Sequence, residues 1–226
     1  MQYTKIEKII RDSLLDVRDL YTNKPITSHV IFPKYSDNTE RYSEQELKSI
    51  FLSKIEQSAF YYSVETPSRN KYRFVENDEP KVSFCGEESK EVFQSSMIDT
   101  TLYDSNKTLL SHIEFKYGQS SVFSIQKDFL KLICESQNVK YNYFAHYLGN
   151  SDNGTKKAIF SKYRQALNNI MTINTNIDDF ERKISKIIIF VMFARLNEIY
   201  RFSLKDFAEN LNLDAYLETI SQPTER

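Results

Sequence analysis

Two segments in the middle of the chain alternate apolar and polar residues with the period of a β-strand. Residues 97–104 and 113–118 each place charged side chains on one face and apolar side chains on the other. A polar loop joins them, so the pattern predicts two adjacent antiparallel strands. The apolar face comprises Ile98, Thr100 and Leu102 in the first strand and Leu109, Ile113 and Phe115 around the second.

The flanking segments predict two further strands. Residues 60–64 and 141–148 are rich in aromatic residues and alternate like strands. The first should end at Thr66-Pro67, because proline cannot donate a hydrogen bond to a sheet ladder. Residues 75–95 are polar and predict a loop or an irregular hairpin.

Helical spacing accounts for most of the remaining chain. Ser43 and Glu46 have the spacing of a capping box, and Ser124 can cap a later helix. The apolar run from Ile187 to Ala194 is too short to cross a bilayer and predicts a buried helix instead. The predicted helices cover residues 1–21, 43–57, 125–135, 159–171 and 178–200, with a short one from Ser203 to near Leu213.

A hairpin with a four-residue loop at 105–108 would bring two carboxylates together. In that register Thr101 pairs with His112, and Asp99 pairs with Glu114. Paired residues have Cβ atoms roughly 4.5–5.5 Å apart. Both carboxylates could therefore bind one hard divalent cation such as Mg²⁺, which prefers oxygen ligands.

Lys116 lies two residues beyond Glu114 and shares its face. Its ammonium could hold a phosphate oxygen or stabilise negative charge that develops during a reaction. A Glu-x-Lys sequence is also common on a solvated strand face, where it forms a weak ion pair. The position of Asp99 favours a functional site over a solvated face, because a carboxylate between apolar neighbours is costly unless something compensates it.

These residues and the order of the elements resemble the PD-(D/E)XK nuclease superfamily. Residues 43–148 follow its αβββαβ core, with Asp99 on the second strand and Glu114-Phe115-Lys116 on the third. Ile98 stands where the motif has proline, which leaves the metal ligand intact. The resemblance implies an α/β fold with a restriction-endonuclease-like core and a mixed sheet, and Mg²⁺- or Mn²⁺-dependent hydrolysis of nucleic acid, most often DNA, in repair or defence. Asp99 and Glu114 would bind the metal, with the Phe115 carbonyl as a possible further ligand.

The resemblance also implies a glutamate from the first core helix. Glu46 is the first candidate, although its capping box already gives it a structural role. Glu56 and Glu65 are the alternatives, the latter near a strand end.

Nucleic acid contacts are expected in two places. The resemblance implies Gln126 or Lys127, on the helix after Lys116, as substrate contacts. A basic patch on a later helix includes Lys156, Lys157 and Arg164. Such a run is also typical of a solvated helix face, and the net charge of −1 favours neither possibility.

Composition sets the outer limits. The 226 residues suit one domain, divided into an N-terminal helix and lead-in (1–42), the nuclease-like core (43–148) and C-terminal helices (149–226). The charged N-terminus lacks a signal-like apolar run, and two cysteines lack metal-type spacing, so we expect a cytoplasmic protein without membrane contact. It could need a recognition partner or a second copy. The alternatives are an inactive nuclease fold that binds nucleic acid or protein, and a structural protein in which Asp99 and Glu114 are surface acids.

Overall fold

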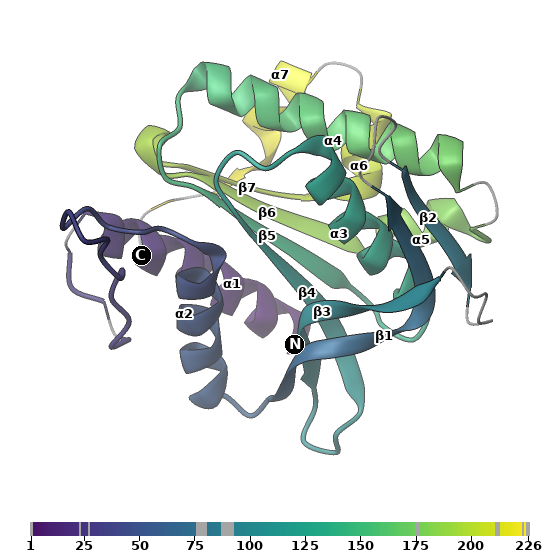
Figure 1. Ribbon diagram of the computed structural model, residues 1–226, viewed down its shortest axis with the longest axis horizontal. Helices are drawn as coiled ribbons and strands as arrows, with labels where there is room; N and C mark the ends of the chain where they lie inside the picture. The colour runs from purple at the N-terminus through teal and green to yellow at the C-terminus, as the bar shows by residue number, and fades with distance from the viewer. Residues whose placement is uncertain are drawn as a thin grey trace.

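A mixed β-sheet forms the centre of the protein (Figure 1). The computed structural model describes residues 2–22, 24–26, 28–75, 81–86, 93–174, 177–210, 213–222 and 224. Its strands lie in the order β2-β1-β3-β4-β5-β6-β7-β8, with β5 parallel to β4 and to β6 and the other neighbours antiparallel. The strands are β1 (Tyr61–Val75), β2 (Lys81–Gly86), β3 (Gln94–Tyr103), β4 (Leu109–Tyr117), β5 (Asn142–Leu148), β6 (Ile187–Phe193), β7 (Glu198–Ser203) and β8 (Ser221–Gln222).

Helices cover both faces of this sheet, which makes the protein an α/β fold. The first two helices pack on one face, and the remaining α-helices pack on the other (Figure 1). Across the described residues, no helix combines the length and the apolar character needed to cross a membrane. The helices are α1 (Gln2–Tyr21), α2 (Glu44–Glu56), α3 (Val122–Cys134), α4 (Asn153–Ile173), α5 (Phe180–Ser185), α6 (Leu204–Glu209), α7 (Leu213–Ile220) and the 3₁₀ turn η1 (Ala194–Leu196).

Alternation along the central strands divides the hydrophobic core into two layers. In β5, Phe144 and Leu148 face α3 and α4, whereas Tyr143, Ala145 and Tyr147 face α1 and α2. The same alternation runs along β6. Both faces of these strands are therefore buried, as is usual where parallel strands lie in the middle of a sheet.

Local signals explain why the first core helix begins where it does. Ser43 is the N-cap of α2, and its side chain and Glu46 form the reciprocal hydrogen bonds of the expected capping box.

The apolar stripe predicted for residues 1–21 is buried in α1, with Ile6 and Leu14 fully covered. The strand predicted at 141–148 is β5.

The helix predicted over 178–200 is wrong, and so is a purely helical C-terminal part. The residues form the short helix α5, strand β6, the turn η1 and strand β7. A continuous apolar run is equally typical of a buried strand and a buried helix, so periodicity alone could not decide. Three consecutive isoleucines at the start of β6 favour the strand, because β-branched residues pack well on a pleated surface.

Three boundaries also differ from the prediction, and one strand is additional. Strand β1 continues past Pro67, with a register shift before Lys71. It pairs with β2 in the region expected to be a loop or an irregular hairpin, and the hairpin is the alternative that holds. Residues 76–80 and 87–92 of that region lie outside the described residues. Helix α3 is capped by Ser121 instead of Ser124, and α6 ends at Glu209.

Candidate functional site

The candidate site lies where strands β3 and β4 separate. The predicted pairing of Thr101 with His112 is confirmed, but the ladder ends at Thr100 and Ile113, one position before the predicted pair of Asp99 and Glu114. Beyond this point the side chain of Asp99 replaces a strand contact, because its Oδ2 accepts a 2.8 Å hydrogen bond from the Phe115 N–H. Asp99 is thereby fixed beside Glu114 and Lys116 without a backbone ladder between the strands.

Glu114 is held by a lysine from the helix above it. The Lys131 Nζ lies 2.7 Å from Glu114 Oε1 and 3.1 Å from Asp128 Oδ1, and it donates a hydrogen bond to the Met97 carbonyl. Glu114 is 1 % exposed and Lys131 is 6 % exposed. The alternative in which Glu114 is a surface acid is therefore wrong, and Lys131 is buried with it.

Lys116 is fixed by the same helix. Its Nζ lies 2.6 Å from Asp128 Oδ2, and it also donates a 3.2 Å hydrogen bond to Ser124 Oγ. Glu44 Oε2 lies 3.9 Å away on the opposite side, at the start of α2. Lys116 therefore bridges α2 and α3 across the fork of the sheet.

Helix α2 contributes a second cation. The Lys48 Nζ lies 2.6 Å from Glu65 Oε1 and 3.8 Å from Asp99 Oδ1. Glu65 has a φ of 48° within β1, a left-handed conformation that is uncommon for residues other than glycine. Strained backbone of this kind is often found at functional sites. Glu65 thus lies at the edge of the site, as one of the sequence alternatives expected.

Together these side chains form what we term the acid–lysine cluster. It contains four carboxylates and three ammonium groups, so negative charge is in excess even before Glu65 is counted. Its members are Glu44, Asp99, Glu114 and Asp128 with Lys48, Lys116 and Lys131.

Burial and this excess charge change the proton affinities of the cluster. Burial raises the pKa of Glu114 well above its usual value, and the neighbouring Asp128 and Asp99 carboxylates act in the same direction. Burial also raises the pKa of Glu44. Burial alone would lower the pKa of Lys116, but the nearby Asp128 carboxylate outweighs it and raises that pKa. Burial and neighbouring carboxylates therefore oppose ionisation of Glu114 and Glu44, whereas the same carboxylates keep Lys116 protonated.

The donor chemistry of the cluster fits a hard divalent cation. Such cations bind carboxylate and carbonyl oxygens, and the excess negative charge would favour one. Among the described residues, however, no three acidic, histidine or cysteine side chains are already placed to share a metal ion. The ion pair between Lys131 and Glu114 accounts for part of this, because the ammonium lies where a cation would bind Glu114.

The glutamate of α2 that reaches the cluster is none of the three sequence candidates on helix or strand. Glu46 Oε2 accepts hydrogen bonds from the Ser43 N–H and hydroxyl, which uses the carboxylate for the cap. Glu56 accepts a hydrogen bond from the Tyr62 hydroxyl. Glu44 reaches Lys116 instead. The sequence offers a weak signal for this, because a residue directly after the N-cap can point towards a neighbouring strand edge.

The expected nucleic acid contacts have diverse surroundings. Gln126 is 1 % exposed and accepts a hydrogen bond from Asn169 between α3 and α4. Lys127 lies 4.8 Å from the centre of the Phe74 ring. In the basic patch, two of the three residues are engaged within the protein. The ammonium of Lys156 pairs with Glu198, and Arg164 donates a hydrogen bond to the Asn210 carbonyl. Lys157 is exposed.

Asp128, Lys48 and Lys131 were not among the sequence candidates. Asp128 and Lys131 are three residues apart on α3, a spacing that places both on one face of a helix. That face is the one α3 buries against the sheet, so two charged residues within it are a signal that could have been used. Comparison with known protein families, curated proteins and solved structures found no match to the chain.

Proposed function

We propose that the protein is a divalent-metal-dependent nuclease that hydrolyses phosphodiester bonds in nucleic acid, with DNA as the favoured substrate. The observation that carries this proposal is the gathering of Glu44, Asp99 and Glu114 around Lys116 at the fork of β3 and β4. The order α2, β1, β3, β4, α3 and β5, with the edge strand β2 inserted after β1, supports a restriction-endonuclease-like core of the PD-(D/E)XK superfamily.

In this proposal Asp99, Glu114 and Glu44 would hold Mg²⁺ or Mn²⁺, with the Phe115 carbonyl as a further oxygen donor. A bound ion would supply a water of lowered pKa and positive charge at the scissile phosphate. Lys116, which stays protonated beside Asp128, would place its ammonium against a phosphate oxygen where negative charge develops. Lys131 would withdraw from Glu114 to admit the ion.

Cleavage assays with a matched pair of variants test this proposal. Supercoiled plasmid, linear DNA and single-stranded RNA are incubated with the protein in Mg²⁺ or Mn²⁺, and with EDTA as a control. We expect metal-dependent cleavage that Lys116→Ala lowers by about 100-fold or more, the usual effect of losing one charge-stabilising group. Lys205→Ala, which removes a half-buried lysine of α6 outside the acid–lysine cluster, should cleave at the original rate.

Equal loss of activity in both lysine variants, or cleavage that persists in EDTA, would contradict the proposal. Circular dichroism of each variant excludes unfolding as the cause of a loss.

A second candidate function is a nuclease fold that binds nucleic acid without cutting it. The observation in its favour is the ion pair between Lys131 and Glu114, which compensates one proposed ligand without a metal. This candidate predicts binding of DNA or RNA in EDTA at an affinity that Mg²⁺ does not change, together with no cleavage of any substrate.

A further inference from the structure

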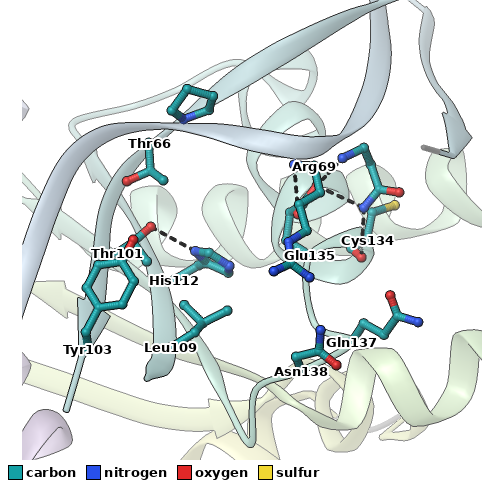
Figure 2. A pocket seen from close by; sticks show the side chains of 12 residues that line it. Thr66, Arg69, Thr101, Tyr103, Leu109, His112, Cys134, Glu135, Gln137 and Asn138 are labelled. Carbon is teal, nitrogen blue, oxygen red and sulfur yellow. Dashed lines mark hydrogen bonds between the residues drawn. The ribbon is translucent and has the colours of Figure 1, made fainter. Parts of the chain in front are cut away.

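A small cavity lined by both polar and apolar side chains lies on the same face of β4 as the acid–lysine cluster. Its volume is about 140 Å³, and it is enclosed by the irregular part of β1, the β3–β4 hairpin and the loop after α3 (Figure 2). Drug-sized ligands and large cofactors occupy pockets of roughly 300–1,000 Å³, so this cavity suits one small, flat group. The polar lining includes Arg69, Thr101, His112, Glu135, Gln137 and Asn138.

Two of the lining groups keep free hydrogen-bonding positions. His112 is 7 % exposed, and its Nδ1 bonds to the Thr101 hydroxyl 2.9 Å away, whereas its Nε2 makes no such bond to any described residue. The guanidinium of Arg69 likewise has no ion pair or hydrogen bond among the described residues, although its backbone N–H bonds to Glu135. Arg69 is exposed and the Nε2 of His112 is not fully buried, so a ligand that enters the cavity can reach both groups.

Glu135, by contrast, is fully engaged. Its carboxylate accepts hydrogen bonds from the N–H groups of Arg69 and Asn70, from the Asn70 amide and from the Tyr72 hydroxyl. These bonds hold the irregular part of β1 in place and form one wall of the cavity. Because the carboxylate is engaged, the groups left to meet a ligand are a guanidinium, an imidazole and two side-chain amides.

The position of the cavity relates it to the proposed chemistry. His112 and Glu114 are alternate residues of one strand, so their side chains lie on one face roughly 7 Å apart. A nucleic acid strand whose phosphate lies at the cluster would carry a neighbouring nucleotide past this cavity. Guanidinium planes and polar side-chain edges are the groups that recognise unstacked bases.

From these observations we infer that the cavity binds one unpaired nucleobase beside the scissile phosphate. The inference deepens the proposed function, on which it rests, by naming the substrate class as single-stranded nucleic acid or a duplex with an unpaired nucleotide. A base within a regular duplex cannot enter a pocket of this kind until it leaves the stack.

The test compares a six-nucleotide oligothymidylate with a strand of the same length that lacks every base, each carrying a fluorescent label. Binding is measured by anisotropy in EDTA, which prevents cleavage. The variants are Arg69→Ala and, as the matched control, Arg73→Ala, which removes an exposed arginine from the same strand outside the cavity.

We expect the intact protein and Arg73→Ala to bind the strand with bases about tenfold more tightly than the abasic strand, as loss of base contacts predicts. In Arg69→Ala this preference should fall to about twofold or less. Equal loss of affinity for both strands would mean that Arg69 contacts phosphate, and it would overturn the inference, as would an equal affinity of the intact protein for the two strands.

Oligouridylate replaces oligothymidylate in a parallel series to distinguish RNA from DNA, and a preference for bases in either series supports the inference. The plasmid assay separates the two proposals. Metal-dependent cleavage without a base preference leaves the nuclease and removes the pocket. A base preference that depends on Arg69, without cleavage, leaves the pocket and removes the nuclease.

Discussion

The ammonium of Lys131 competes with any cation for Glu114. Replacement by Met keeps the length of the side chain but leaves Glu114 without its nearest countercharge, so Lys131→Met should lower the free energy of unfolding in EDTA by about 3 kcal/mol. Because the vacated position can then accept a cation, Mn²⁺ should restore more stability to this variant than to the intact protein. Urea unfolding with EDTA and with Mn²⁺ measures both effects.

Lys205→Met is the control for that experiment, because its lysine lies on α6 and pairs with exposed acids. An identical response of intact protein and Lys131→Met to Mn²⁺ would show that the ion does not bind at Glu114.

His146 provides a second prediction at this scale. Burial lowers its pKa to about 4, and the ring bonds to the Tyr163 hydroxyl and the Gly118 carbonyl. In the unfolded chain the ring takes up a proton near pH 6.5, so more protons are bound by the unfolded state between pH 6.5 and 4. This group therefore costs about 2 kcal/mol of stability on acidification from pH 8 to 5.

The variant His146→Gln should lose stability at pH 8 but fall less steeply towards pH 5 than the intact protein. Urea unfolding at both pH values measures this difference. Parallel pH profiles of the two proteins would contradict the assignment of a neutral buried ring.

Asp99, Glu114 and Lys116 could be singled out from sequence because strand alternation alone places them on one face. Their partners Asp128 and Lys131 reach them through a helix packed across the sheet, and the sequence signal for them was two charged residues on the buried face of α3. The neutralisation of Glu114 is a tertiary contact, which neither spacing nor residue type specifies. The same holds for Arg69 and His112, which lie 43 positions apart in the chain and meet at one cavity.

At the scale of the element, helix α2 carries two glutamates, Glu44 and Glu46, for which we expect different roles. Glu46→Ala removes half of the capping box and should cost about 1 kcal/mol of stability, measured by urea unfolding. It should leave the proposed cleavage within about twofold. Glu44→Ala removes a cluster carboxylate whose burial already raises its pKa, so it should lower cleavage by about tenfold or more with little loss of stability. If Glu46→Ala lowered cleavage and Glu44→Ala did not, Glu46 would be the glutamate of the proposed site.

The elements themselves were predictable where amphipathic spacing was clear, as in α1, α2, α3 and α4. The failure at β6 has a physical origin, because a strand buried on both faces shows no alternation. Positive φ at Asn197 allows the tight turn from β6 to β7, and this local chemistry was the available signal for two strands.

For the molecule as a whole, the distribution of charge matters more than its sum. The net charge is −1, and the three lysines of the acid–lysine cluster are already paired with acids of the protein. The cluster itself therefore offers few cations to release counterions from nucleic acid. Binding should depend weakly on salt, with a slope of log K against log salt of about −2 to −3.

Lys156 and Lys157 provide the sharpest test of this distribution, because they are neighbours on one helix with opposite surroundings. Lys156 pairs with Glu198 at 2.9 Å, whereas Lys157 is exposed and free of ion pairs among the described residues. If α4 contacts the phosphate backbone, Lys157→Ala should reduce the salt slope by about 1 and Lys156→Ala should leave it unchanged. Titration of a labelled single strand at several salt concentrations measures both slopes. An unchanged slope in both variants would place α4 away from the nucleic acid and leave the cavity beside β4 and the acid–lysine cluster to provide the contacts.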